Sequence, residues 1–395
     1  MRRPELGNLP AAMASSSKDQ TRMRPTLRLL IVSLLATVLA PAWAMSVTFI
    51  NPGRASESFW NTSARAAEAA AHALGVDFEV IYLERQHLAA LDVVRELVAR
   101  PVERRPDYVM LVNEAGVAPE ALRILDAAGL RTLLVYSGIQ GAQERTLAGA
   151  PRDTLRLWLG SIEPRAEEAG YLTAKALIEK GREAGAFGPD GKLHLLAIAG
   201  DRSTPSSIRR SEGMRKAVDE AGDAVLDQEV FGAFSREKAA EQSAWLFQRF
   251  PDARLVWAAS DQMAFGAMAS WEARGGQPGR DAWFSGINTS GEATKALREG
   301  RLTALSGGHF ILGAWAVVML YDHHHGVDFA DSEGLELSAS VFPLFSVRDA
   351  DTFERRYGSG HFGTIDFRRF SKALNPKLER YDFGFRPLLE GRDTP

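Results

Sequence analysis

The chain has 395 residues, 45% of them hydrophobic, with no cysteine and a formal net charge of −3. This length exceeds one ordinary core and predicts two lobes of about 100–200 residues each. Because positive and negative charges nearly balance, the sequence does not indicate the strongly basic surface that binds nucleic acid or an anionic membrane. We therefore expect neither as a partner. The lack of cysteine excludes a disulfide framework and a lipid-modified cysteine anchor.

Residues 23–44 have the pattern of a secretory signal peptide. A basic start leads into the apolar run Leu29–Leu39, and an Ala-Trp-Ala triplet forms a small-x-small cleavage site before Met45. We interpret residues 1–22 as the product of an upstream start codon in preference to a disordered leader. The alternative of a membrane anchor is disfavoured because the apolar run is too short to span a bilayer. Export without a lipid anchor predicts a location in the bacterial periplasm.

Strand-like and helix-like segments alternate from the start of the mature chain. Short apolar runs bounded by Gly, Pro or Asn are typical of buried strands. The runs "SVTFI", "DFEVIYL" and "DYVMLV" are each followed by a helical pattern, and the run "RTLLVYS" comes after the third of these helices. Such alternation predicts a parallel sheet with helices on both faces.

The pattern breaks at residues 138–156 and then restarts as a second series. Its strand-like runs are "LHLLAIAG", "AVLDQEVFG", "ARLVWAAS", "AWFSGIN" and "LTALSGG", again separated by helical patterns. We therefore predict an α/β fold of two doubly wound, Rossmann-like parallel-sheet lobes. The apolar segment "ILGAWAVVMLYDHHHG" that follows is too short to span a membrane and predicts a buried helix. The tail is rich in aromatic and Arg residues, and we expect it to pack on its own chain.

Polar and aromatic residues recur where the predicted strands end. Ligands of open parallel sheets bind beyond these ends, so these residues are expected to share a crevice. Aromatic faces suit the C–H patches of a sugar, while carboxylate, amide and guanidinium groups suit its hydroxyls. The predicted ligand-binding residues are Glu57, Phe59, Trp60, Asn113, Ser137, Arg210, Phe234, Ser260, Asp261, Asn288 and His309.

Four segments together resemble the type I periplasmic binding protein family of ribose-binding-protein-like sugar-binding components of ABC transporters. They are "SESFWNTSARAAEAAAHALG", "STPSSIRRSEGMRKAV", "SDQMAFGAM" and "FSGINTSGEATKALREGRLTAL". The resemblance implies that Phe59 and Trp60 stack on a sugar from one lobe and Phe234 from the other. It also implies that Arg210 and Asn288 hold hydroxyls. Other pocket positions differ from the ribose-binding pattern, so the sugar itself is not named.

The resemblance further implies three crossovers between the lobes, which we place near Ser161, Gly308 and Ala339. The lobes then comprise residues 45–161 with 309–340 and residues 162–308 with 341–350, followed by an extension over 351–395. A monomer without a cofactor is expected to deliver a small sugar or polyol to the membrane permease of an ABC importer. A ligand-sensing subunit that signals to a membrane sensor kinase or cyclase is the alternative.

Other functions find less support in the residues. The chain has no Gly-x-Ser-x-Gly elbow, Walker loop or dinucleotide fingerprint, so we do not expect an enzyme. A glycosidase pair of Glu57 and Asp261 is disfavoured because Asp261 opens a helix and suits its N-cap. The adjacent histidines 323–325 diverge around a helix, so we expect no metal site there. A signal peptide in place of a helix-turn-helix argues against a repressor.

Overall fold

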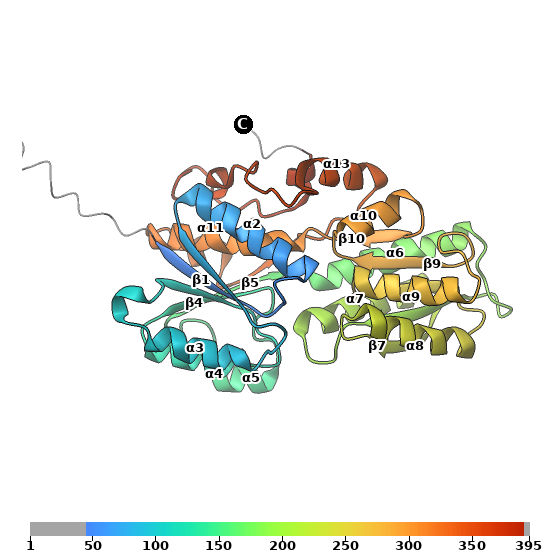
Figure 1. The fold of residues 1–395 in the computed structure, drawn as a ribbon, viewed down its shortest axis with the longest axis horizontal. Helices are drawn as coiled ribbons and strands as arrows, with labels where there is room; N and C mark the ends of the chain where they lie inside the picture. Colours follow the sequence, from blue (N-terminus) through green and yellow to red (C-terminus); the bar gives the residue numbers. More distant parts are fainter. Residues whose placement is uncertain (1–44, 391–395) are drawn as a thin grey trace, which may run out of the picture. The chain divides into compact units, whose positions relative to one another are not determined.

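The structure is a computed structural model that describes residues 45–390. The predicted leader (1–22) and signal peptide (23–44) lie outside the described residues. Two parallel β-sheets, each covered by helices on both faces, make up the fold (Figure 1). This arrangement confirms the predicted fold class.

The first sheet has six parallel strands in the order β11-β5-β4-β3-β1-β2. Helices α2 and α11 pack together on one face, while α3, α4 and α5 cover the other (Figure 1). The strands are β1 (Ser46–Asn51), β2 (Asp77–Tyr82), β3 (Tyr108–Leu111), β4 (Arg131–Val135), β5 (Trp158–Pro164) and β11 (Glu336–Ala339). The helices are α2 (Ser58–Leu74), α3 (Ala89–Ala99), α4 (Ala118–Ala127), α5 (Ala142–Ala148) and α11 (Leu312–His324).

Strand β3 illustrates why the strands read as unbroken apolar runs. Val109 and Leu111 join the core beneath α3 and α4, while Tyr108 and Met110 join the core on the opposite face. Both faces of a parallel sheet are buried, so a central strand such as β3 is a nearly continuous apolar run.

The second sheet has five parallel strands in the order β10-β9-β8-β6-β7. Helices α6 and α7 pack as one pair, and α8 and α9 pack as another. The strands are β6 (Leu193–Ala199), β7 (Ala224–Phe231), β8 (Leu255–Ala258), β9 (Trp283–Ile287) and β10 (Ala304–Ser306). The helices are α6 (Ala166–Glu183), α7 (Pro205–Ala221), α8 (Arg236–Arg249), α9 (Asp261–Ala273) and α10 (Gly291–Arg298).

The chain passes between the two sheets three times. It leaves the first sheet after β5, which continues past Ser161 to Pro164, and enters α6. It returns after β10 through the short helix η2 (His309–Ile311) into α11. It leaves again after β11, and Phe345 then donates its backbone N–H to Leu305 of β10 over 2.8 Å.

The C-terminal part of the chain packs against both halves of the fold. Helix α13 (Val347–Tyr357) lies on α10, where Thr294 donates to Glu354 over 3.2 Å. The ring of Phe383 stacks on Trp315 of α11 with centroids 5.0 Å apart. These contacts agree with the expectation that the tail packs on its own chain. The remaining short helices are α12 (Ala330–Glu333), η1 (Val102–Arg104), η3 (Phe367–Phe370) and α14 (Arg386–Leu389).

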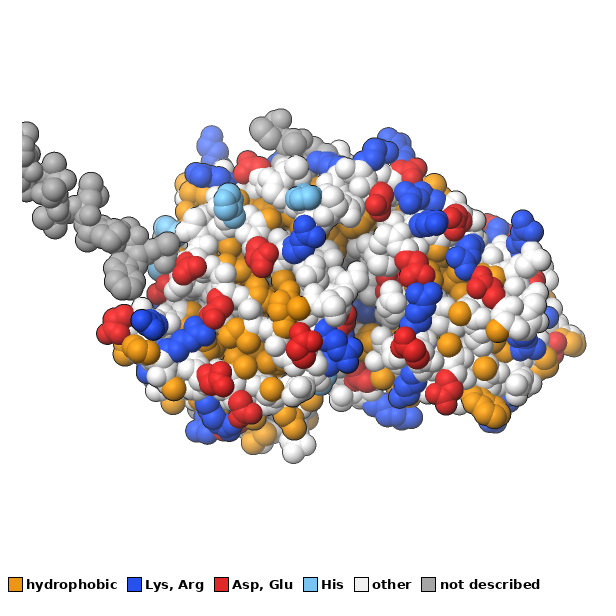
Figure 2. Space-filling model, viewed as in Figure 1, with side chains coloured by type: hydrophobic (Ala, Val, Ile, Leu, Met, Phe, Trp, Pro, Cys, Tyr) orange, Lys and Arg blue, Asp and Glu red, His pale blue; other side chains and the backbone are white. Residues whose placement is uncertain are grey.

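Two surface properties bear on function. Within residues 45–390, no helix combines the length and the apolar character that crossing a membrane requires. Positive and negative side chains are interspersed over the face shown in Figure 2, without a broad patch of one sign.

Candidate functional site

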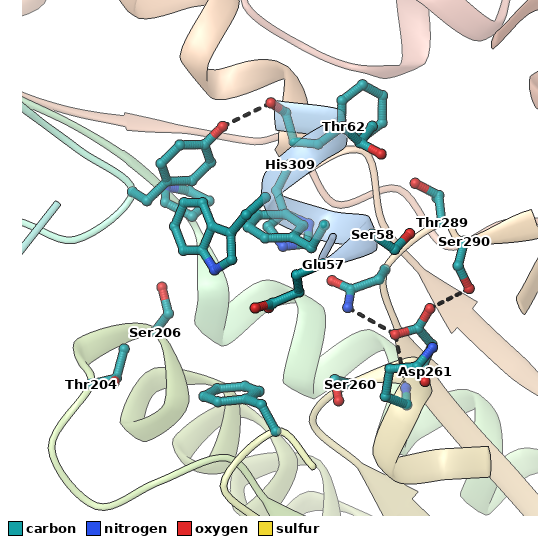
Figure 3. Close-up of a pocket in the computed structure, with 18 of the residues that line it drawn as sticks. Glu57, Ser58, Thr62, Thr204, Ser206, Ser260, Asp261, Thr289, Ser290 and His309 are labelled. Atoms are coloured by element: carbon teal, nitrogen blue, oxygen red, sulfur yellow. Dashed lines mark hydrogen bonds between the residues drawn. The ribbon is translucent and has the colours of Figure 1, made fainter. Parts of the chain in front are cut away.

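A cavity of about 390 Å³ lies where the carboxyl ends of strands from both sheets meet. Loops after β1, β3 and β4 of the first sheet contribute lining residues, as do those after β6, β7, β8 and β9 of the second. Figure 3 shows the Glu57 carboxylate pointing into this space, with Thr204 and Ser206 on one side and Ser260 and Asp261 on another. The predicted residues that line the cavity are Glu57, Phe59, Trp60, Ser137, Arg210, Phe234, Ser260, Asp261, Asn288 and His309.

Asn113 is the predicted residue that does not line the cavity. Its amide nitrogen donates to Gly138 O over 3.0 Å and to Glu144 Oε2 over 2.9 Å. Its amide oxygen accepts the backbone N–H of Ala118 at the start of α4 over 3.1 Å. These bonds tie the loop after β3 to the loop after β4 and to helices α4 and α5 outside the cavity lining, and the neighbouring Glu114 lines the cavity instead.

Aromatic rings form the apolar part of the lining. The ring of Phe59 lies 4.9 Å from Trp60, edge to face, and stacks on His309 at 4.5 Å. Trp60 is only 5% exposed and covers Gly53, where a Cβ would come within 2.1 Å of its ring. Phe59 and, from the second sheet, Phe234 are half-buried and offer more accessible ring surface. Phe234 has a φ of 55°, a left-handed conformation that sets its direction.

Arg210 and His309 form the polar centre of the cavity. Arg210, on α7, donates one Nη to Ala259 O over 2.7 Å and the other to His309 Nε2 over 3.1 Å. Burial lowers the pKa of Arg210 to about 10, against the opposing effect of Asp261, so the guanidinium stays charged at neutral pH. Arg210 Nε and His309 Nδ1 are buried without a hydrogen-bond partner among the described residues.

Asp261 orders the second-sheet side of the cavity. Its carboxylate accepts from Asn288 Nδ2 over 2.9 Å and also from Ser290 Oγ. Burial raises the pKa of Asp261, and the Ser290 and Asn288 bonds oppose that shift. The helix cap differs from the sequence interpretation, because Ser260 is the N-cap of α9 and accepts from Met263 N. Asp261 sits one residue later, which frees its carboxylate for the loop after β9.

A cluster of charges on the first-sheet side was missed by the sequence analysis. Arg85, in the loop after β2, donates Nε to Glu57 Oε2 over 2.8 Å and also donates an Nη to Glu57 Oε1. Its other Nη lies 3.6 Å from Glu114 Oε2. Burial raises the pKa of Glu114 to about 7 despite the opposing charge of Arg85. Arg85 follows the end of β2, so the expectation that ligand-binding residues follow strand ends would have identified it if it had also been applied to this strand.

The adjacent histidines 323–325 at the end of α11, where no metal site was expected, contact other groups of the protein. Tyr108 OH and His323 Nδ1 are 3.0 Å apart, and His325 Nδ1 lies 2.7 Å from Tyr321 O. Asp322 accepts the backbone N–H of Lys372 over 2.7 Å in the C-terminal extension. Over residues 45–390, no group of three or more His, Asp or Glu side chains is arranged to hold a metal ion.

Two parallel sheets joined by three crossings, with a polar and aromatic cavity where strands of both sheets end, are the features of a class of two-lobed solute-binding proteins. The chain belongs to the periplasmic binding protein family, because the family described as "Periplasmic binding protein domain" matches residues 47–326. The type I fold of this family accounts for both sheets and their crossings.

Solved structures support the assignment. A periplasmic sugar-binding protein from Pseudomonas fluorescens is 37% identical, with a TM-score of 0.78 over 87% of this chain and 99% of its own. The binding protein of the arabinose ABC transporter from Shewanella sp. ANA-3 is 20% identical, with a TM-score of 0.66 over 80% and 96%. A solute-binding protein from Actinobacillus succinogenes with bound D-allose is 16% identical, with a TM-score of 0.65 over 78% and 99%. A comparison with curated proteins finds no match.

Proposed function

We propose that this chain binds a small sugar or polyol in the periplasm and delivers it to the permease of an ABC importer. The observation that carries the proposal is one cavity that combines half-buried rings, Phe59 and Phe234, with Arg210, Asp261 and Glu57. Rings cover the C–H faces of a sugar, and charged groups exchange strong hydrogen bonds with its hydroxyls. The 37% identity to a periplasmic sugar-binding protein supports the same ligand class.

Recognition is proposed to involve both halves of the fold. Phe59 and Glu57 follow strand β1 of the first sheet, whereas Arg210, Phe234 and Asp261 follow strands β6, β7 and β8 of the second. A ligand that contacts both halves stabilises the arrangement in which they are closest, so binding is coupled to hinge closure. The closed protein is then the form that the permease recognises. In this proposal one lobe comprises residues 45–161 with 309–340, and the other comprises residues 162–308 with 341–350.

A thermal-shift screen of residues 45–395 tests the ligand class. The panel contains L-arabinose, D-allose, D-galactose and myo-inositol, with L-lysine and palmitate as ligands of other classes. A sugar or polyol that binds the folded protein stabilises it by RT ln(1 + L/Kd), where L is the ligand concentration, so Tm rises with the logarithm of that concentration above Kd. We expect at least one carbohydrate to raise Tm and to be recovered unchanged afterwards. A shift with lysine or palmitate alone would contradict the proposal.

Periplasmic location is proposed on the position of the predicted cleavage site. Met45 is already buried and β1 starts at Ser46, so the fold begins where the signal peptide is expected to end. The full chain, expressed in a Gram-negative host, should appear in the periplasmic extract with the mass of residues 45–395. Recovery only from the cytoplasm at full length would contradict this location.

A further inference from the structure

The loop between β2 and α3 has an unusual backbone. Glu84 and Arg85 are consecutive non-glycine residues with φ angles of 50° and 66°. Side chains disfavour this left-handed region, and such conformations persist only where surrounding contacts hold them. Here the backbone N–H groups of Glu84 and Arg85 donate to Gly53 O and Pro52 O, each over 3.1 Å. The loop is therefore fastened to the segment that leads to Glu57.

This turn places the Arg85 guanidinium against one edge of the Glu57 carboxylate. Both Glu57 oxygens accept from Arg85, one from Nε and one from Nη, in a fork that fixes the plane of the carboxylate. The arginine and glutamate side chains are 24% and 27% exposed. Each carboxylate oxygen accepts more than one hydrogen bond, so both keep a lone pair for a donor in the cavity.

The local charge is negative in spite of Arg85. Glu114, with a side chain only 10% exposed, lies 3.6 Å from the same guanidinium. His87 Nδ1 is 3.1 Å from Glu114, although the contact lacks hydrogen-bond geometry. Above about pH 7, where Glu114 is ionised, two carboxylates thus share one permanent cation, and the charge of Asp201 adds to theirs. A ligand carboxylate or phosphate placed here meets like charges in a poorly solvated site, which is unfavourable.

We propose that Arg85 is a specificity-determining positioning residue, which holds Glu57 as a paired acceptor for two adjacent hydroxyls at an uncharged end of the ligand. The inference rests on the proposed function and names the chemistry that this part of the cavity selects. Arg85 also lines the cavity, but its Nε and one Nη are engaged by Glu57, so its proposed effect is on how well that carboxylate is oriented and how negative it remains.

Three variants separate this role from a structural one. Arg85→Met removes both the fork and the charge, whereas Arg85→Lys keeps the charge and loses the fork. Arg152→Met is the matched control, because Arg152 also forks onto a carboxylate, that of Asp328, and its side chain is also 24% exposed. Arg152 does not line the cavity.

Calorimetric titration of the four carbohydrates, with D-galacturonate and L-arabinonate added as acids, provides the first readout. For the tightest-binding neutral carbohydrate, we expect Arg85→Met to weaken binding about 10–100-fold, the effect of losing well-oriented bonds to a charged group. The affinity of Arg85→Lys should fall between those of Arg85→Met and the parent protein. Arg152→Met should change the affinity less than about 2-fold. The parent protein should bind each acid more weakly than its neutral counterpart.

The pH profile of binding gives the second readout. Without Arg85, the negative charges of Glu57 and Asp201 act on Glu114 uncompensated, so the pKa of Glu114, which the charge of Arg85 holds down, rises further. The pH midpoint of affinity should therefore move upward in Arg85→Met and return towards the parent value in Arg85→Lys. Equal affinity and an equal midpoint in Arg85→Met, or acids that bind as tightly as their neutral counterparts, would overturn the inference. If no carbohydrate binds the parent protein, the proposed function fails, and this inference fails with it.

Discussion

Arg210 Nη2 donates a hydrogen bond to His309 Nε2 over 3.1 Å, across 99 positions of the sequence. A guanidinium only donates, so Nε2 of His309 accepts and the imidazole proton resides on Nδ1. Burial, reinforced by the charge of Arg210, holds the pKa of His309 well below its usual range. His309 is therefore neutral at physiological pH.

This pairing predicts a pH dependence of stability that His309→Gln abolishes. In the unfolded chain His309 takes up a proton near pH 6.5, whereas in the folded chain it stays neutral. The unfolded state then binds more protons as pH falls below about 6.5, so the contribution of His309 to stability decreases. Urea unfolding from pH 7.5 to 5.5 should show the parent protein losing free energy of unfolding relative to His309→Gln. His72→Gln, at an exposed site on α2, is the control, and parallel curves for parent and His309→Gln would contradict the prediction.

Glu114→Gln should have the opposite pH dependence. The pKa of Glu114 is raised from 4.5 to about 7, so the folded chain keeps a proton that the unfolded chain has released between these values. Stability contributed by this proton is present below about pH 4.5 and is lost as pH rises towards 7, by about 3 kcal/mol in total. Relative to Glu114→Gln, the parent protein should lose free energy of unfolding over this interval. The exposed Glu96→Gln should follow the parent curve; if Glu114→Gln does so too, the buried-carboxyl interpretation is wrong.

Phe59→Ala should weaken carbohydrate binding. Its ring lines the cavity and stacks on His309, so truncation removes an apolar wall and loosens a polar partner. The expected loss is about 1–3 kcal/mol of binding free energy in calorimetry. Phe78→Ala, which removes an equally half-buried ring from β2 outside the cavity, controls for general loosening of the core. Equal affinities of the two variants would contradict the role of Phe59.

Asp322→Ala should destabilise the protein by releasing its C-terminal extension. The buried carboxylate accepts from Lys372 N over 2.7 Å, Ala373 N over 3.1 Å and Tyr381 OH over 2.8 Å. Its loss leaves these donors unsatisfied, at a cost of about 3–5 kcal/mol in the free energy of unfolding. Urea unfolding measures the change, with the exposed Asp331→Ala on α12 as the control. A loss below about 1 kcal/mol would show that the extension is held by other contacts.

Much of the fold followed from the sequence. Parallel strands are buried on both faces, so "DYVMLV" and "LHLLAIAG" read as apolar runs, and their alternation with helical patterns predicted both sheets. The same order placed Glu57, Arg210 and Asp261 at strand ends, where parallel topology gathers side chains at one edge. Those residues line one cavity in the structure.

Other features depended on tertiary contacts. Asn113 and Arg85 both follow strands, yet Asn113 bonds to groups outside the cavity lining, while Arg85, in a left-handed turn, lines the cavity. That difference lies in individual backbone angles, which are held by carbonyls of a neighbouring loop and leave no periodic signal. The extension carried only weak periodicity, and its Phe383 is buried by Trp315 from a distant helix. Sequence pattern therefore determined which layers form, while packing between distant segments decided which strand-end side chains line the cavity.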